Sequence, residues 1–286
     1  MSVSTIATPR RRTDTSAAAV LGAAVLALYV PVFRELFAIW INGTYYSYGF
    51  LVPLFSAYLV WEALRDAARR NGDARAADLD TGGFVIMAAG LGALGLGVAV
   101  GSLALRTLSL PVVLMGAATA TLGPALARRL AFPIGFLVFM TPLPEGALPA
   151  VSLPLQRFAA VVAEHALRAL GISVVRDDLF LTLPSVTLHV TEACNGLRFL
   201  LAMLVVGAAF AGTTQRRPLR RAGIMAAALS IAIVANLARV TGTGVMAELW
   251  GARAAIGLTH IVWGKVVYLA ALVPFVALVV ILRRRA

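Results

Sequence analysis

The chain has 286 residues, of which 60% are hydrophobic and only 13% are charged, and its mean hydropathy is +0.88. Because a soluble domain averages about 25% charged residues, this composition excludes an ordinary soluble protein and indicates a polytopic membrane protein. The net charge of +12 would suggest a nucleic-acid partner in a soluble chain, but all but one of the 25 basic residues are arginine, and most lie in short segments between apolar runs. We therefore interpret the arginines as topology signals and expect no nucleic-acid partner.

The apolar runs predict an all-α membrane fold. A helix needs about 20 residues to cross a hydrocarbon core of roughly 30 Å, and about eight runs approach this length. The weakest run, 130–143, is short and is closed by Pro142 and Pro144, so we expect it either to be re-entrant or to continue past these prolines. The predicted spans lie near residues 17–33, 46–64, 82–104, 107–127, 130–143, 196–212, 222–245 and 263–282.

Arginine clusters test this count, because basic residues in short loops remain on the cytoplasmic side. The clusters fall at alternate helix ends, as eight spans with both termini in the cytoplasm require. We expect residues 1–15 to be a disordered cytoplasmic N-terminus and 16–286 to be a single integral membrane domain, without a cleaved signal peptide. The clusters lie at residues 10–12, 65–75, 128–129, 216–221 and 283–285.

The segment before the sixth span differs in sequence pattern from the apolar runs. Apolar residues recur at helical spacing over residues 154–171, with charged residues between them, which predicts an amphipathic helix in the outer membrane interface. Residues 172–190 are rich in β-branched residues and alternate in polarity, which predicts a small β-hairpin that turns at Pro184–Ser185. The hairpin would place Cys194, which follows it in the chain, at the membrane surface.

Cys194 is the only cysteine of the chain, so it cannot form an intrachain disulfide. We expect Asn195 and Gly196 to start a helix, with Arg198 one turn below Cys194 on the same face. A thiol at a helix N-terminus beside a guanidinium has its thiolate form favoured. Cys194 is therefore a candidate nucleophile, with Arg198 as a supporting residue and Glu192 as a helix cap or an ion-pair partner of Arg198.

A second polar site lies inside the seventh predicted span. Asn236, Arg239 and Thr243 share one helical face. An arginine at the centre of a membrane helix costs about 2.5 to 3.5 kcal/mol by insertion scales, which implies a partner or a function. Arg239 could hold a substrate carbonyl or carboxylate or stabilise a developing oxyanion, and Asn236 is a supporting candidate.

A third site, His260, lies at the outer entrance to the last span. Histidine changes its charge near neutral pH, so it is suited to move a proton from a thiol to a leaving amine. Cys194, Arg239 and His260 on one side of the membrane form a plausible set for acyl transfer.

These segments resemble the exosortase/archaeosortase family of membrane cysteine transpeptidases. The resemblance runs from about residue 40 to residue 270. Two positions depart from the family pattern: Tyr48 replaces the histidine of the usual Tyr-Ser-His-Gly, and Asn195 replaces the more common serine. The matching segments are Tyr46 to Pro53, Phe139 to Pro144 with Leu155-Gln156, Glu192 to Arg198, Asn236 with Arg239, and His260 with Gly264.

The resemblance implies an activity, a partner and a compartment. The substrate would be an exported protein that ends in a short recognition motif, a transmembrane helix and a basic cluster, such as a PEP-CTERM-like tail. Cys194 would form a thioester and release the tail, and an unidentified acceptor nucleophile would resolve the thioester. Arg239 and His260 would complete the catalytic set, with roles that could be exchanged. The protein would be a multi-pass protein of the bacterial inner membrane, with its active site on the periplasmic face.

Each of the three candidate catalytic residues could instead have a purely structural role. Cys194 could be an inert small apolar residue, Arg239 a structural ion pair, and His260 an interfacial anchor or helix cap. We expect His165 and His189 to be structural, and Arg253 is the reserve candidate for Arg239.

Two other classes of function stay open. A transporter or export-channel subunit would explain an intramembrane arginine without covalent chemistry, although no hydropathy repeat is evident. A membrane scaffold would fit the Gly/Ala-rich segment 90–101. Neither the one cysteine and three histidines nor any glycine-rich loop forms a metal or nucleotide motif, so we expect no metal and no cofactor.

Overall fold

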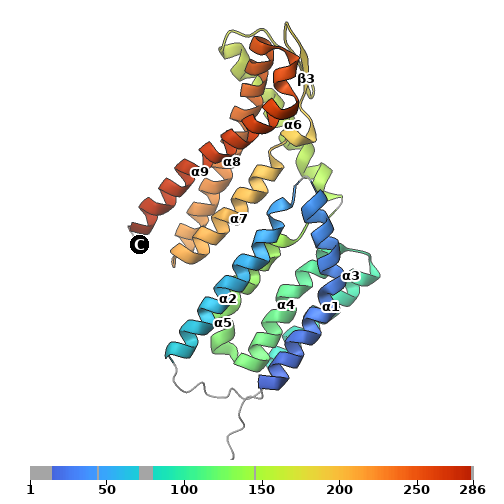
Figure 1. Cartoon of the computed structure of the whole chain (residues 1–286), viewed down its shortest axis with the longest axis vertical. Helices are drawn as coiled ribbons and strands as arrows, with labels where there is room; N and C mark the ends of the chain where they lie inside the picture. Colours follow the sequence, from blue (N-terminus) through green and yellow to red (C-terminus); the bar gives the residue numbers. More distant parts are fainter. Residues whose placement is uncertain (1–14, 44, 71–79, 145, 285–286) are drawn as a thin grey trace, which may run out of the picture. The chain divides into compact units, whose positions relative to one another are not determined.

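Most of the described chain is helical, which confirms the predicted all-α polytopic fold, and the described residues also include a small three-stranded sheet. The described residues divide into two compact units (Figure 1). The first holds the residues up to Gly43 and residues 47–142, and the second holds Tyr45, Tyr46 and the residues from Leu143 onward. This computed structural model describes residues 15–43, 45–70, 80–144 and 146–284.

The first unit contains five α-helices and two short 3₁₀ helices among its described residues. In chain order these are α1 (Thr15–Asn42), η1 (Ser47–Phe50), α2 (Leu51–Arg70), α3 (Thr81–Ala99), α4 (Leu103–Leu122), α5 (Pro124–Phe136) and η2 (Leu137–Met140).

Glycines on α3 allow α4 to approach closely. A Cβ atom at Gly90 would lie 2.7 Å from Val113 Cγ2 and 2.8 Å from the Val113 backbone nitrogen. A Cβ at Gly83 would overlap the backbone of Ala120 in the same way. Small residues at such a contact let two membrane helices pack backbone against backbone.

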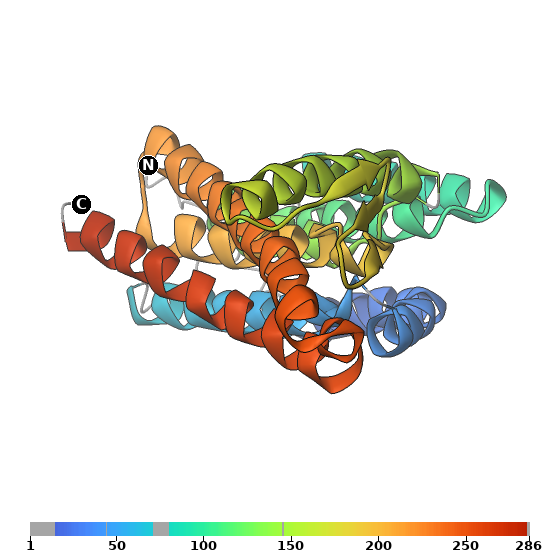
Figure 2. The same cartoon turned by 90° about the horizontal axis from the view of Figure 1, so that it is seen from above.

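The second unit contains α6 to α9, the sheet and two further 3₁₀ helices. Helix α8 packs against α6, α7 and α9, and Figure 2 shows the strands lying along α6. The elements are α6 (Ala147–Ala169), β1 (Val175–Asp177), β2 (Phe180–Thr182), β3 (Thr187–His189), η3 (Glu192–Cys194), α7 (Leu197–Thr214), α8 (Pro218–Trp250), η4 (Ala252–Ala255) and α9 (Gly257–Arg284).

The sheet is an antiparallel meander in the order β1-β2-β3, in which Leu181 pairs with Arg176 on one side and Leu188 on the other. The predicted hairpin turn is confirmed, because the backbone N–H of Leu183 donates to Val186 across Pro184–Ser185 at 2.9 Å. The predicted hairpin is therefore formed by β2 and β3. A third strand, β1, extends it, and the sequence did not reveal this strand because it has only three residues, two of which are charged. The buried face of the sheet packs on α6 and α8 through Leu181, Leu183, Val190, Ala160, Ala163 and Val240.

Seven described helices are long and apolar enough to cross a membrane. The expected fifth span, 130–143, is not among them. Gly123, with a φ of 79°, and Pro124 start α5 earlier than predicted, and the α-helix ends at Phe136, where a 3₁₀ turn follows. The segment is therefore shorter than a full span. The seven are Val20–Asn42, Ser47–Arg69, Thr81–Ala99, Leu103–Leu122, Leu197–Thr214, Pro218–Trp250 and Gly257–Arg283.

Helix α1 continues well past residue 33, where the first predicted span ends. Its continuation carries Glu35, whose two oxygens accept from the Arg106 guanidinium of α4 at 2.7 and 2.8 Å. A charge paired inside the bundle costs far less than an isolated one, so the helix tolerates Glu35 and runs to Asn42.

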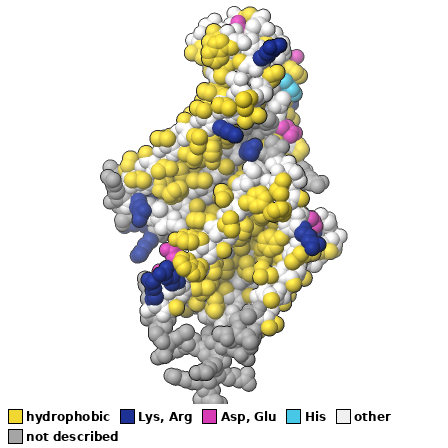
Figure 3. All heavy atoms as spheres, in the orientation of Figure 1, with side chains coloured by type: hydrophobic (Ala, Val, Ile, Leu, Met, Phe, Trp, Pro, Cys, Tyr) yellow, Lys and Arg dark blue, Asp and Glu magenta, His cyan; other side chains and the backbone are white. Residues whose placement is uncertain are grey.

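The surface of the protein is that of a lipid-exposed bundle. Figure 3 shows hydrophobic side chains over most of the visible face, with basic side chains confined to small groups. Val85, Leu269 and Val273 are 69%, 62% and 70% exposed, respectively. Such exposure would be costly in water but suits hydrocarbon.

Three predictions remain without a structural test. The disordered N-terminus and the arginine cluster at 10–12 lie outside the described residues, apart from Thr15, which begins α1. Part of the cluster at 65–75 lies in α2 and the rest is outside the described residues. The single membrane domain over residues 16–286 stays a prediction.

Candidate active site at one end of helices α7, α8 and α9

Two of the three predicted catalytic positions lie at the starts of helices, and the third, Arg239, lies inside α8. Helix α8 has 33 residues and is therefore about 50 Å long, more than the roughly 30 Å of a hydrocarbon core. Arg220 lies in its first turn, and about 20 residues separate it from Arg239, which is close to one membrane thickness. Cys194 precedes α7, and His260 lies in the first turn of α9, whose last residues include Arg283. All three candidates therefore lie near the membrane surface opposite these basic helix ends.

The chain makes a tight turn at Cys194. The 3₁₀ helix η3 ends at Cys194, and Gly196 then adopts the left-handed conformation with a φ of 77° before α7 begins at Leu197. Helix α7 starts after Asn195 and Gly196, as predicted, but Cys194 belongs to η3, because the left-handed Gly196 separates it from α7. The backbone turn, rather than the first turn of a long helix, positions the thiol.

The side chain of Asn195 holds this turn in place. It is 2% exposed. Its Oδ1 accepts from the backbone N–H of Leu197 at 2.7 Å, and its Nδ2 donates to Ser152 of α6 at 2.6 Å and to the Tyr45 hydroxyl at 3.2 Å. The Ser152 hydroxyl accepts a further hydrogen bond from Gln156 Nε2 at 2.8 Å. The residue after Cys194 thus ties the turn to two distant segments.

Glu192 takes part in the same network. The Tyr45 hydroxyl lies 3.3 Å from Glu192 Oε2, to which it donates. Desolvation by burial raises the pKa of Tyr45 above its ordinary value, although the hydrogen bond with Asn195 opposes this shift. Tyr45 therefore remains a neutral donor, and the Glu192 carboxylate has a partner that sequence reasoning did not identify.

Asn236 contacts the Cys194 turn from the opposite side. Its Nδ2 donates to the backbone carbonyl of Cys194 at 3.1 Å. A Cβ atom at Gly196 would lie 2.6 Å from Asn236 Cγ. Position 196 therefore requires glycine for two reasons, its positive φ and the proximity of Asn236.

Arg239 lies one turn beyond Asn236 and is 7% exposed. Its guanidinium carbon stacks over the Phe199 ring of α7 at 5.1 Å. It is close enough to interact electrostatically with Cys194 and with His260. The predicted shared face is confirmed, because Asn236, Arg239 and Thr243 are all buried.

Two residues fix the backbone of Arg239. Its carbonyl oxygen accepts from Thr243 Oγ1 at 2.8 Å and from Trp263 Nε1 of α9 at 3.0 Å. A Cβ atom at Gly264 would lie 3.6 Å from both Cδ and Nη1 of Arg239. Helix α9 therefore holds the arginine close to His260, which precedes Trp263 by about one helical turn.

His260 is partly buried at the start of α9. Its Nδ1 is inaccessible to solvent and has no hydrogen-bond partner within the described part of the chain. A ring nitrogen in this state has unused hydrogen-bonding capacity.

The remaining candidates differ in their surroundings. Arg198 is exposed in the first turn of α7 and repels Arg239 electrostatically. His165 Nδ1 hydrogen-bonds the Val161 carbonyl at 2.7 Å, and His189 stacks on Phe180 with ring centroids 4.5 Å apart. Arg253 is exposed in η4.

Sequence reasoning missed the roles of Tyr45, Ser152, Phe199 and Trp263. Trp263 lies in the segment around His260, and its spacing from that residue was the only signal available. Ser152 and Tyr45 lie far from Cys194 in the chain, and no local pattern links them to it. The segments that carried the resemblance also meet in the fold, because the Tyr46 hydroxyl accepts from the Leu143 backbone N–H at 2.9 Å.

The architecture defines the class: a polytopic helical membrane protein with a buried arginine, a cysteine and a histidine at one end of three helices. A family model described as transmembrane exosortase matches residues 40–277. The chain therefore belongs to the transmembrane exosortase family. Searches of curated protein sequences and of solved structures found no match.

Proposed function

We propose that this exosortase is a cysteine transpeptidase that cleaves C-terminal sorting signals from exported proteins. The observation that supports it best is the buried Arg239 guanidinium, which interacts electrostatically with Cys194. A cation at this position can stabilise the negative charge that develops as a sulfur attacks a carbonyl carbon. Membership of the family supports a peptidase or transpeptidase whose substrates carry such signals.

In the proposed reaction, His260 takes the proton of the Cys194 thiol, and the sulfur attacks the carbonyl carbon of the scissile peptide bond. Arg239 stabilises the negative oxygen that develops on this carbon. As the C–N bond breaks, His260 delivers a proton to the departing nitrogen, and the tail leaves as a free amine. An acceptor nucleophile then attacks the thioester, loses its proton to His260 and restores the thiolate.

The substrate of the proposed reaction is an exported protein with a recognition motif, a transmembrane helix and a basic cluster at its C-terminus. Its helix would lie in the bilayer, so the scissile bond would be presented at the membrane surface where Cys194 lies. By the positive-inside pattern of the arginines, this surface is the periplasmic face of a bacterial inner membrane.

The test is the intact mass, from cells, of a secreted protein of the same genome that ends in these three elements. We expect the tail to be lost with the wild-type enzyme and retained with Cys194→Ala and Cys194→Ser, at unchanged enzyme level. The added mass on the product would identify the acceptor. Equal tail loss with the wild type and both variants would end the assignment of Cys194 as nucleophile and leave a transporter or export subunit as the alternative.

A further inference from the structure

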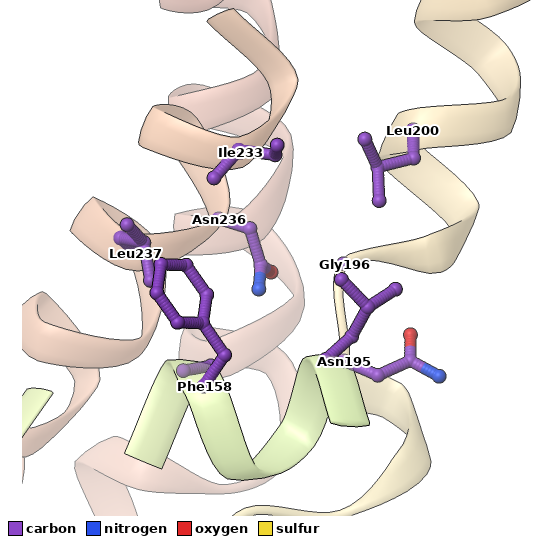
Figure 4. A pocket seen from close by; sticks show the side chains of 9 residues that line it. Phe158, Asn195, Gly196, Leu200, Ile233, Asn236 and Leu237 are labelled. Carbon is purple, nitrogen blue, oxygen red and sulfur yellow. The ribbon is translucent and has the colours of Figure 1, made fainter. Parts of the chain in front are cut away.

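A pocket opens beside the Cys194 turn, between α6, the start of α7 and α8 (Figure 4). Its walls are apolar except for Asn195 and Asn236, which line it beside the turn. Its empty space is about 230 Å³ including the open mouth. The enclosed cavity is about 10 Å³, the room of about one water molecule. A side chain therefore enters only as the walls move apart, and a helix, whose diameter is about 10–12 Å, is too wide to enter. The apolar wall residues include Leu155, Phe158, Leu200, Ile233 and Leu237.

The orientation of the Asn236 amide follows from its partner. The Cys194 carbonyl oxygen can only accept, so the amide nitrogen of Asn236 must face it. Oδ1 then faces away from Cys194. It is buried and has no hydrogen-bond partner among the residues that the structure describes. Figure 4 shows the side chain extending between Phe158 and Leu237 on one side and Gly196 and Leu200 on the other.

An unpaired buried acceptor is costly and calls for a partner. Asn236 is only 5% exposed, and it lines the pocket. A backbone N–H of a bound peptide would satisfy Oδ1. Phe158, which also lines the pocket, is 49% exposed.

We propose that this pocket is the subsite for an apolar side chain on the acyl side of the scissile bond, and that Asn236 Oδ1 accepts a backbone N–H of the same segment. This inference rests on the proposed function. The acyl part of the substrate is the part that stays bonded to Cys194 in the thioester, and the next two residues, Asn195 and Gly196, line the pocket. The released part is a helix, which is too wide to enter.

The wall chemistry defines which side chain the subsite takes. A charged side chain would lose its hydration without gaining a partner, so the walls exclude it. Ile233 lies on the α8 wall above Asn236 (Figure 4). Its size therefore sets how large an aliphatic or aromatic side chain the pocket admits.

Peptidyl chloromethyl ketones test the subsite on the full-length protein in detergent. In these reagents a chloromethyl group replaces the scissile amide; the Cys194 thiolate forms an S–C bond, the C–Cl bond breaks and chloride leaves. The series is N-acetyl-Gly-X, with X as Gly, Ala, Val, Leu, Phe or Asp. We expect Val or Leu to alkylate Cys194 about 10 to 100 times faster than Gly or Asp, measured by intact mass.

Variants of Ile233 should change the order of the alkylation rates among the reagents. Ile233→Ala should raise the rate of the Phe reagent by about tenfold relative to Val, and Ile233→Phe should abolish the preference for Val and Leu. Val234→Ala is the matched control, because Val234 is the next residue of α8 and is 64% exposed. It should leave the order unchanged.

An ester analogue tests the role of Asn236 separately. Replacing the N–H of residue X by oxygen should slow the best reagent about tenfold with the wild type and have no effect with Asn236→Ala. Equal slowing in both proteins would overturn the role of Oδ1.

The failures of the two proposals are distinguishable. If iodoacetamide alkylates Cys194 but the peptide reagents all react equally or not at all, the subsite is overturned, whatever the fate of the sorting tail. If the reagents show the expected order but no tail is processed, the subsite stands and the transpeptidase proposal fails.

Discussion

Glycine brings helices together in both units, but the neighbours differ. At the α3–α4 contact, Gly83 and Gly90 face backbone and aliphatic atoms. At the α7–α8–α9 contact, Gly196 faces the amide of Asn236 and Gly264 faces the guanidinium of Arg239. The same small residue serves backbone packing in one unit, and in the other it makes room for polar side chains near Cys194. A close helix contact is therefore no sign of a functional site until its neighbours are known.

The arginines of the two units show the same contrast. Arg106 forms a two-point ion pair with Glu35, which accounts for its charge within the bundle. Arg239 instead stacks on Phe199 and interacts electrostatically with Cys194. The first arginine pairs with a carboxylate, and the second lies near the proposed nucleophile.

The largest expected effect is therefore that of Arg239→Lys. A lysine ammonium cannot reproduce a planar two-point contact or the stacking on Phe199, so tail processing should fall about 10² to 10³-fold. Arg106→Lys is the matched control and should retain processing within about threefold, because a surface-to-core ion pair of this kind acts on stability. Rates would be measured from the cleaved fraction over time, and comparable losses in both variants would remove the distinction between the two arginines.

The second largest loss of processing is expected at Gly196, and Gly90 serves as the comparison. Gly196→Ala places a Cβ in a left-handed residue, at a cost of about 1–2 kcal/mol, and forces Asn236 away from the Cys194 carbonyl. We expect processing to fall about 10 to 100-fold. Gly90→Ala should instead lower the melting temperature in detergent through overpacking, by about 1–3 kcal/mol of stability, with the catalytic rate of the folded fraction unchanged. A catalytic loss in Gly90→Ala that exceeds its loss of folded protein would contradict this separation.

A smaller effect is expected for the Asn195 network. Asn195→Ala removes hydrogen bonds to Leu197, Ser152 and Tyr45, so the Cys194 turn should loosen and the catalytic rate should fall about tenfold. Asn195→Ser can still accept from the backbone and should recover part of this loss. The rate constant for Cys194 alkylation by iodoacetamide gives a second readout, and identical behaviour of wild type and Asn195→Ala in both assays would exclude a positioning role.

The smallest effect should come from the sheet. His189→Leu keeps an apolar contact for Phe180, on which the exposed His189 ring stacks. We expect processing within about twofold of wild type and a small change in melting temperature, as for most exposed substitutions. A large loss of processing would mean that the sheet takes part in substrate binding.

Local patterns in the sequence determined much of the fold and the identity of the main site residues. Apolar length fixed the membrane spans, because crossing hydrocarbon demands it, and helical spacing placed Asn236, Arg239 and Thr243 on one face. The length of the apolar run did not predict the helix correctly at residues 130–143, because Gly123 and Pro124 shift its start. It also failed for the end of α1, where a distant arginine neutralises Glu35.

Only the tertiary structure decided how the site is held. Tyr45, Ser152 and Asn195 come from three separate segments, and their hydrogen bonds depend on how those segments pack. The left-handed Gly196, the amide of Asn236 against the Cys194 carbonyl and the pocket beside them likewise arise from packing. The physical reason is range: hydropathy and helical period act between neighbours in the chain, whereas these contacts join residues up to 150 positions apart.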